Sequence, residues 1–71
     1  MIKFFSKRGC GLCTMAKTRA KKYTNIEYII LEDSSPLIEK YDIQTVPTVI
    51  VNDQKYTTLK EIHDILKVEG K

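Results

Sequence analysis

The sequence has few of the residues that mark several common protein classes. Its 71 residues include no tryptophan, three glycines, two prolines, two cysteines and one histidine. So little Gly and Pro excludes a collagen-like repeat, and 42% hydrophobic residues with 30% charged residues exclude a disordered tail. The longest apolar run, Val46 to Val51, is interrupted by Pro47 and is far shorter than the roughly 20 residues of a membrane helix. We expect a single globular domain over residues 1–71.

Charge and N-terminal composition limit the location and the partners. Residues 1–8 contain no stretch long enough for the hydrophobic region of a secretion signal, so a cytoplasmic location is expected. The net charge is +3, and six of the 12 positive residues lie between Lys7 and Lys22. So small an excess of positive charge is typical of a solvated helix face and predicts no nucleic-acid partner. We also expect a monomer and no membrane partner.

Hydrophobic patterns and capping residues predict an α/β fold in the order β-α-β-α-β-β-α. Strands are predicted at 2–5, 26–31, 48–51 and 55–57, and helices at about 12–23, 36–41 and 59–68. Ser35 with Pro36 predicts one helix start, and Thr58 with Glu61 predicts a capping box at another. Two apolar helix faces are predicted: Leu12, Ala16, Ala20 and Tyr23, and Leu59, Ile62, Ile65, Leu66 and Val68.

The connections between these elements predict how the strands pair. The first crossover passes through a helix, so its two strands should be parallel, whereas the hairpin around Asn52-Asp53 should be antiparallel. We expect a four-stranded mixed sheet with helices on both faces.

The two cysteines, Cys10 and Cys13, carry the strongest functional signal. A disulfide between residues three apart closes a very small loop and adds little stability, which favours redox chemistry or metal binding. Cys10 precedes the first helical turn, where free N–H groups and the helix dipole favour a thiolate. Cys13 lies one turn on, within reach of a disulfide. We predict that Cys10 is the nucleophile and that Cys13 resolves the mixed disulfide.

Metal binding is the main alternative for this pair. A zinc site needs four ligands, and beyond the two cysteines the chain offers only His63, which we expect on the surface of the last helix. A metal or iron–sulfur cluster would then need ligands from a second chain or another molecule. We assign no metal-binding residue.

A second segment, Thr45-Val46-Pro47, precedes a predicted strand. A proline after Val at this place is either a candidate cis peptide or a residue at the start of an edge strand. Read with the cysteine pair in so small a domain, it favours a redox site.

The chain resembles a glutaredoxin of the thioredoxin-fold superfamily over nearly its whole length. The segment from Phe5 to Cys13 matches the glutaredoxin active-site segment in spacing, with Lys7 three residues before the nucleophile, and Thr45-Val46-Pro47 matches the family's Thr-Val-Pro. The resemblance implies a minimal thioredoxin fold and a cis proline beside the redox pair. It also implies a substrate site, to which we assign Lys7, Gly11, Leu12, Val46, Pro47, Thr57 and Thr58.

Two departures from the glutaredoxin pattern fall within that site. Gly11-Leu12 stands where the family has Pro-Tyr, and Thr57-Thr58 stands where it has a Gly-Gly pair whose bare backbone approaches the glutathione carboxylate. The side chains of Thr57 and Thr58 add bulk there, so weak glutathione binding is expected.

The resemblance implies a small thiol–disulfide oxidoreductase that needs no cofactor beyond its redox-active disulfide. Its substrates would be protein or small-molecule disulfides, its electron donor a reductase or glutathione, and a reductase such as ribonucleotide reductase an acceptor. The alternatives are a metal- or iron–sulfur-binding carrier bridged through Cys10 and a redox-inactive binding module, which the presence of both cysteines disfavours.

Overall fold

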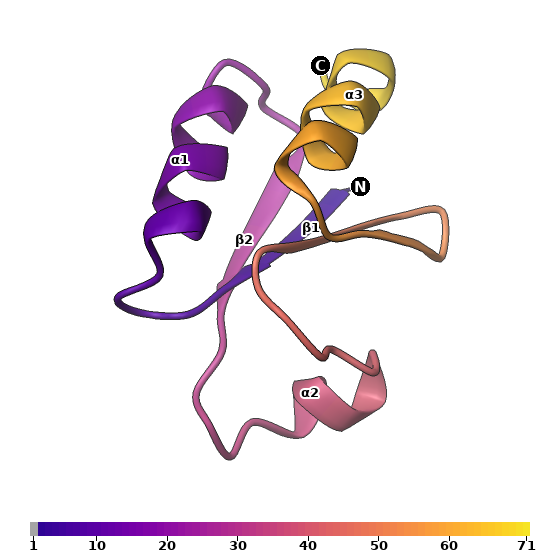
Figure 1. Ribbon diagram of the computed structural model, residues 1–71. Coiled ribbons are helices and arrows are strands. Elements are labelled where there is room, and N and C mark those ends of the chain that lie inside the picture. Colours follow the sequence, from indigo (N-terminus) through magenta and orange to yellow (C-terminus); the bar gives the residue numbers. More distant parts are fainter. Residues whose placement is uncertain (1) are drawn as a thin grey trace.

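The computed structural model describes residues 2–71 and contains the seven predicted elements in the predicted order (Figure 1). The strands are β1 (Ile2–Ser6), β2 (Ile26–Ile30), β3 (Thr48–Val51) and β4 (Gln54–Tyr56). The helices are α1 (Gly11–Ala20), α2 (Pro36–Lys40) and α3 (Leu59–Glu69). The predicted α/β class is confirmed, and the predicted boundaries differ from these by at most three residues.

The strands form one open mixed sheet in the order β2-β1-β3-β4. Strand β1 pairs in parallel with β2 and antiparallel with β3, and β3 pairs antiparallel with β4. Both predicted pairings, the parallel crossover and the antiparallel hairpin, are confirmed. The central position of β1 brings the segment that follows it, which contains the cysteines, to the middle of one end of the sheet.

Side chains that face each other across β1 and β2 support their register. The Lys3 Nζ atom lies 3.0 Å from Glu27 Oε1, and this hydrogen bond and charge raise the pKa of Lys3. The rings of Phe4 and Tyr28 lie 5.4 Å apart between centroids, and burial raises the pKa of the Tyr28 hydroxyl. Each pair matches the strand register, in which Lys3 is opposite Glu27 and Phe4 is opposite Tyr28.

Alternation along β1 divides the hydrophobic core into two layers. Phe4 and Phe5 are both fully buried, but successive strand side chains point to opposite faces of the sheet. Phe4 belongs to the larger cluster, with residues of α1 and α3, and Phe5 to a smaller one, with residues of α2 and Ile43. Figure 1 shows α1 and α3 on one side of the sheet and α2 on the other. Helices therefore cover both faces, as predicted.

The predicted apolar face of α1 is wrong at its first residue. The buried residues of this helix are Cys13, Ala16 and Ala20, whereas Leu12 is 54% exposed. Small side chains let α1 pack closely on the sheet, and the larger Leu12 lies outside that contact. The helix also ends at Ala20, three residues before the predicted end, because the chain turns there and the Tyr23 N–H bonds to Ala20 O.

Helices α2 and α3 begin at the predicted caps. Ser35 Oγ accepts a hydrogen bond from the Leu37 N–H at the start of α2, and Thr58 caps α3 in a complete capping box with Glu61. On α3, Ile62 and Leu66 are buried as predicted, but Val68 is 76% exposed. Val68 lies about 200° around the helix from Leu66, so it faces away from the buried side of α3.

The C-terminal segment is hydrogen-bonded to the turn between α1 and β2. Asn25 Nδ2 donates to the Glu69 carbonyl at 3.0 Å, and the Lys71 N–H donates to Asn25 Oδ1 at 3.0 Å. The Ile2 N–H donates to the Asn25 carbonyl at 3.1 Å, so Asn25 joins both chain ends to one turn. Within residues 2–71, none of the helices is long and apolar enough to cross a membrane.

Candidate redox site around Cys10 and Cys13

The cysteine pair follows a short loop that leads from β1 into α1. Gly9 has φ of +76°, a backbone conformation that side chains with a Cβ rarely adopt, so glycine is favoured there. Cys10 comes next in an extended conformation and is the N-cap of α1. The loop thus turns sharply and places the first cysteine where the helix begins.

Cys10 takes the place of the usual oxygen-bearing cap. The Cys13 N–H donates a hydrogen bond to Cys10 Sγ at 3.1 Å, which satisfies one of the N–H groups that a helix start leaves free. The Thr14 backbone N–H and hydroxyl both donate to the Cys10 carbonyl, each at 3.2 Å. These bonds fix Cys10 against the first turn, with its sulfur at the positive end of the helix dipole.

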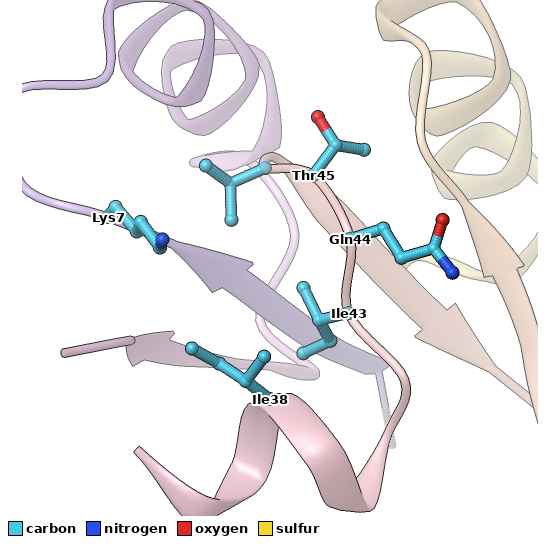
Figure 2. A pocket seen from close by; sticks show the side chains of 6 residues that line it. Lys7, Ile38, Ile43, Gln44 and Thr45 are labelled. Atoms are coloured by element: carbon cyan, nitrogen blue, oxygen red, sulfur yellow. The ribbon is translucent and has the colours of Figure 1, made fainter. Parts of the chain in front are cut away.

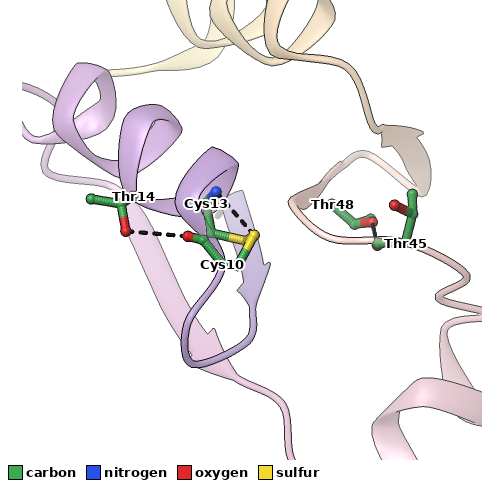
Figure 3. The surroundings of a disulfide bond; sticks show 5 residues. All are labelled: Cys10, Cys13, Thr14, Thr45 and Thr48. Atoms are coloured by element: carbon green, nitrogen blue, oxygen red, sulfur yellow. Dashed lines mark hydrogen bonds between the residues drawn. A yellow bond between two sulfur atoms is a disulfide. The ribbon is translucent and has the colours of Figure 1, made fainter.

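The two cysteines form a disulfide, with Cα atoms 5.2 Å apart (Figure 3). Their surroundings differ, because Cys10 is partly exposed whereas Cys13 is only 2% exposed. An incoming group therefore has more access to Cys10 than to Cys13. Such an asymmetry is typical of a nucleophile and a resolving thiol.

The loop before β3 faces the disulfide, as Figure 3 shows. The Val46–Pro47 peptide bond is cis, as predicted, and Pro47 is buried. The Thr48 hydroxyl, 1% exposed, donates to the Thr45 carbonyl at 2.6 Å and ties the two ends of the loop together. Sequence reasoning missed this contribution of Thr48, although a threonine three residues after a carbonyl acceptor is a known local pattern.

A pocket of about 280 Å³ lies between this loop, α2 and Lys7 (Figure 2). It brings together two of the predicted substrate residues, Lys7 and Val46. Its remaining lining residues, Ile38, Ile43, Gln44 and Thr45, were not predicted as site residues. Gln44 and Thr45 are exposed and lie just before Val46-Pro47 in the sequence. This position is the feature from which they could have been predicted as site residues.

The remaining predicted substrate residues lie outside this pocket. Gly11 and Leu12 are exposed on the first turn of α1, beside the disulfide. Thr57 and Thr58 are exposed just before α3. The fold thus places two of the seven predicted substrate residues in the pocket, two beside the sulfurs and Pro47 buried in the loop before β3, while Thr57 and Thr58 form a separate group.

Thr58 and Glu61 occupy the start of α3 themselves. The Glu61 carboxylate accepts a hydrogen bond from the Thr58 hydroxyl at 3.0 Å and one from the Thr58 N–H at 3.4 Å. In return the Glu61 N–H donates to Thr58 Oγ1 at 3.1 Å. An outside carboxylate would have to compete with a negative side chain already bound to this helix start.

Two exposed ion pairs flank the cysteine loop. Lys7 Nζ lies 3.7 Å from Asp33 Oδ1, and an Arg8 guanidinium nitrogen lies 3.8 Å from Glu32 Oε1. Such solvent-exposed pairs are weak and are screened by salt, so both cations stay accessible to an anionic substrate.

Within residues 2–71, no group of three or more His, Cys, Asp or Glu side chains is arranged to hold a metal ion. His63 is partly buried on α3, as expected from the sequence. A metal at Cys10 would therefore need further ligands from outside this part of the chain.

Comparison with known proteins gives no assignment. No protein-family model matches the sequence, and no curated protein matches it. The four-stranded mixed sheet and the Cys10–Cys13 disulfide are compatible with a thioredoxin-like fold. The closely spaced, disulfide-forming cysteines point to redox activity.

Proposed function

We propose that the chain is a small glutaredoxin-like thiol–disulfide oxidoreductase with the thioredoxin topology. The observation that carries this proposal is a disulfide at the start of α1 in which one cysteine is partly exposed and the other is buried. A structural disulfide closing so small a loop would contribute little, whereas a redox disulfide needs one accessible sulfur.

In the reduced protein, the Cys10 thiolate attacks one sulfur of a substrate disulfide. A bond forms between Cys10 Sγ and that sulfur, and the other substrate sulfur leaves as a thiolate that takes up a proton. The Cys13 thiolate then attacks Cys10 Sγ, which forms the Cys10–Cys13 disulfide and releases the second substrate thiol. Two electrons pass from the protein to the substrate, and a dithiol reductase or glutathione restores the reduced protein.

The hydrogen bond from the Cys13 N–H supports the first step, because it stabilises negative charge on Cys10 Sγ. In the second step Cys10 Sγ is the sulfur under attack, and the substrate sulfur is the leaving group. The pocket that contains Lys7 and Val46 lies beside the loop that faces the disulfide and is where we propose that the substrate backbone binds. Lys7 in this pocket can form an ion pair with a substrate carboxylate.

The occupied start of α3 supports a donor other than glutathione. Glu61 already accepts the hydrogen bonds that an incoming carboxylate would need at Thr58. We therefore propose a dithiol reductase as the main electron donor and protein disulfides as substrates, ribonucleotide reductase among the candidates.

The test is reduction of a small aromatic disulfide by the reduced protein, together with trapping of the intermediate. Wild-type protein should release two thiols per molecule of protein oxidised. Cys13→Ser should accumulate a mixed disulfide detectable by mass spectrometry, because no thiol is left to resolve it. Cys10→Ser is the matched control and should be inactive. Equal activity of wild type and Cys10→Ser would overturn the proposal.

A further inference from the structure

The charges of this chain are divided along the sequence. Residues 1–26 contain seven Lys and Arg residues and no Asp or Glu, whereas all nine acidic residues lie in residues 27–71. Helix α1 and the turn after it lie in the basic part and carry Lys17, Arg19, Lys21 and Lys22. All charged side chains of this helix and of the turn after it are therefore positive.

The positive charges of α1 are not neutralised by the rest of the fold. The ion pairs formed within residues 2–71 involve Lys3, Lys7, Arg8 and Lys55. Arg19, Lys21 and Lys22 are exposed, and no carboxylate of the described chain pairs with them. The Lys22 Nζ atom lies over the Tyr23 ring, 5.3 Å from its centroid, a contact that leaves its charge without an acidic partner. The positive charges of Arg19, Lys21 and Lys22 therefore remain available to acidic groups of another molecule.

Two large apolar side chains are exposed within the first five residues of the same helix. Leu12 is 54% exposed and Met15 is 52% exposed, although both are large enough to fill a core. Leu12, Met15 and Arg19 are spaced at i, i+3 and i+7, so they lie along one stripe of α1, and Lys22 follows at the same spacing in the turn. We call these four residues the α1 stripe. Its apolar residues lie toward the Cys10 end of the helix and its positive residues toward the other end.

We propose that the α1 stripe docks protein substrates whose reactive disulfide is flanked by apolar and acidic side chains. This inference rests on the proposed oxidoreductase function and adds the kind of protein surface that the site selects. Leu12 and Met15 would cover apolar side chains beside the substrate disulfide, while Arg19 and Lys22 would attract acidic ones. Such complementarity raises association rates by about 10- to 1,000-fold at low salt.

Other occupants fit the α1 stripe less well. Two copies of the chain joined through antiparallel stripes would place Leu12 and Met15 of one copy against Arg19 and Lys22 of the other, which leaves these cations without acidic partners. Single-stranded nucleic acid is bound through aromatic side chains that stack on the bases, and the apolar part of the stripe is aliphatic.

The experiment uses two synthetic peptides, each with an intramolecular disulfide flanked by leucines. One peptide carries three glutamates and the other carries three lysines at the same positions. The rate constant for reduction of each peptide by the reduced protein is measured at about 20 mM and about 500 mM salt. We expect the acidic peptide to react at least about tenfold faster at low salt and the two rates to converge at high salt.

Variants assign the preference to the α1 stripe. Arg19→Glu/Lys22→Glu should remove the advantage of the acidic peptide, whereas Lys60→Glu/Lys67→Glu, with the same net charge but changes on exposed positions of α3, should keep most of it. Leu12→Ser/Met15→Ser should slow both peptides. The Arg19→Glu/Lys22→Glu and Lys60→Glu/Lys67→Glu variants should reduce the small aromatic disulfide at the wild-type rate, since it is too small to contact any of these four side chains.

The outcomes separate this inference from the proposed function. Equal rates for the two peptides at low salt, with the small disulfide still reduced, would overturn docking on the α1 stripe alone. Loss of preference in the α3 control would do the same, because it would assign the effect to net charge. Self-association of the wild type, abolished by Met15→Ser, would also overturn it. Failure to reduce any disulfide would overturn the proposed function itself.

Discussion

At the scale of single residues, the two sulfurs differ in access and in hydrogen bonding. Cys10 is partly exposed and its Sγ accepts a hydrogen bond from the Cys13 N–H at 3.1 Å, whereas Cys13 is buried in the first turn of α1. We predict that iodoacetamide at mildly acidic pH alkylates Cys10 of the reduced protein before Cys13. The reason is that only Cys10 is both accessible and stabilised as a thiolate by the helix start.

Mass spectrometry of proteolytic fragments gives the order of modification directly. The rate should fall as the pH drops through the range in which the Cys10 thiolate becomes protonated. The unfolded reduced protein in urea is the control, in which both thiols should react alike. Faster labelling of Cys13 in the folded protein would reverse the assigned roles.

Two buried hydroxyl groups, on Ser6 at the end of β1 and on Thr48 at the start of β3, differ in their hydrogen bonding. Ser6 is fully buried, and its Oγ has no hydrogen-bond partner among residues 2–71. Thr48 is equally buried, but its hydroxyl donates to the Thr45 carbonyl at 2.6 Å. We predict that Ser6→Ala raises the free energy of unfolding by about 1 kcal/mol, whereas Thr48→Val lowers it by about 1 kcal/mol. Urea denaturation measures both, and a loss of stability in Ser6→Ala would show that its hydroxyl is satisfied.

Most of the redox site could be predicted from residue types and spacing, but exposure could not. The cysteine pair and its place before a helix follow from local patterns in the sequence, and the cis bond at Pro47 is implied by the resemblance to glutaredoxins. Leu12 was assigned both to a buried face and to the substrate site, and the structure places it in solvent. The orientation of α1 depends on how closely small residues such as Ala16 and Ala20 approach the sheet, and spacing alone does not determine that contact.

At the scale of elements, the start of α3 decides how the chain should respond to glutathione. Thr58 caps the helix and binds the Glu61 carboxylate, and both Thr57 and Thr58 carry side chains where a bare backbone would admit an anion. We predict weak glutathione-dependent activity for the wild type. Thr57→Gly/Thr58→Gly should raise kcat/KM for glutathione by about tenfold, because one charge-assisted hydrogen bond is regained.

The matched control for this variant is Thr57→Ala/Thr58→Ala. It loses the same hydroxyl groups but keeps a Cβ at each position, so glutathione activity should stay low. Thermal unfolding of both variants shows whether α3 remains folded after its cap is removed, a change that costs about 1 kcal/mol for Ala. Robust glutathione activity in the wild type would contradict the prediction.

The elements themselves were predictable to different degrees. Helix α3 has a capping box and a stripe of large apolar residues, so its start is found to the residue. Helix α1 buries small residues, and its end was predicted three residues late because Lys21 and Lys22 are good helix formers. The chain must nevertheless turn there to reach β2, and this requirement comes from the tertiary structure.

At the scale of the whole molecule, Asn25 connects distant parts of the chain. Its side chain bonds to the Glu69 carbonyl and the Lys71 N–H, and its carbonyl accepts the Ile2 N–H. We predict that Asn25→Ala lowers the free energy of unfolding by about 1–2 kcal/mol, since two side-chain hydrogen bonds are lost. Urea denaturation measures the change.

Gln54→Ala on the exposed edge strand β4 is the control for Asn25→Ala and should be close to neutral. The rate of small-disulfide reduction should not change in either variant, because Asn25 lies beyond the opposite end of α1 from Cys10. A slower reaction in Asn25→Ala with an unchanged stability would contradict this separation.

The sheet illustrates what sequence reasoning can and cannot supply at this scale. The parallel and antiparallel pairings followed from the connections, because a helical crossover and a tight hairpin each favour one direction. The central position of β1 was not predicted. It depends on the pairing of β1 with β3, whose residues lie more than 40 positions apart in the sequence, and no local pattern specifies that pairing.

The bonds of Asn25 also determine which way a tethered molecule would face. Ile2 and Lys71 both contact this residue, and α1 then spans ten residues, about 15 Å, before it reaches Cys10. A linker attached at either end of the described chain would hold that side of the molecule against a surface. The disulfide would point away from it, so protein immobilised on a bead or an electrode would still present its sulfurs to the solution.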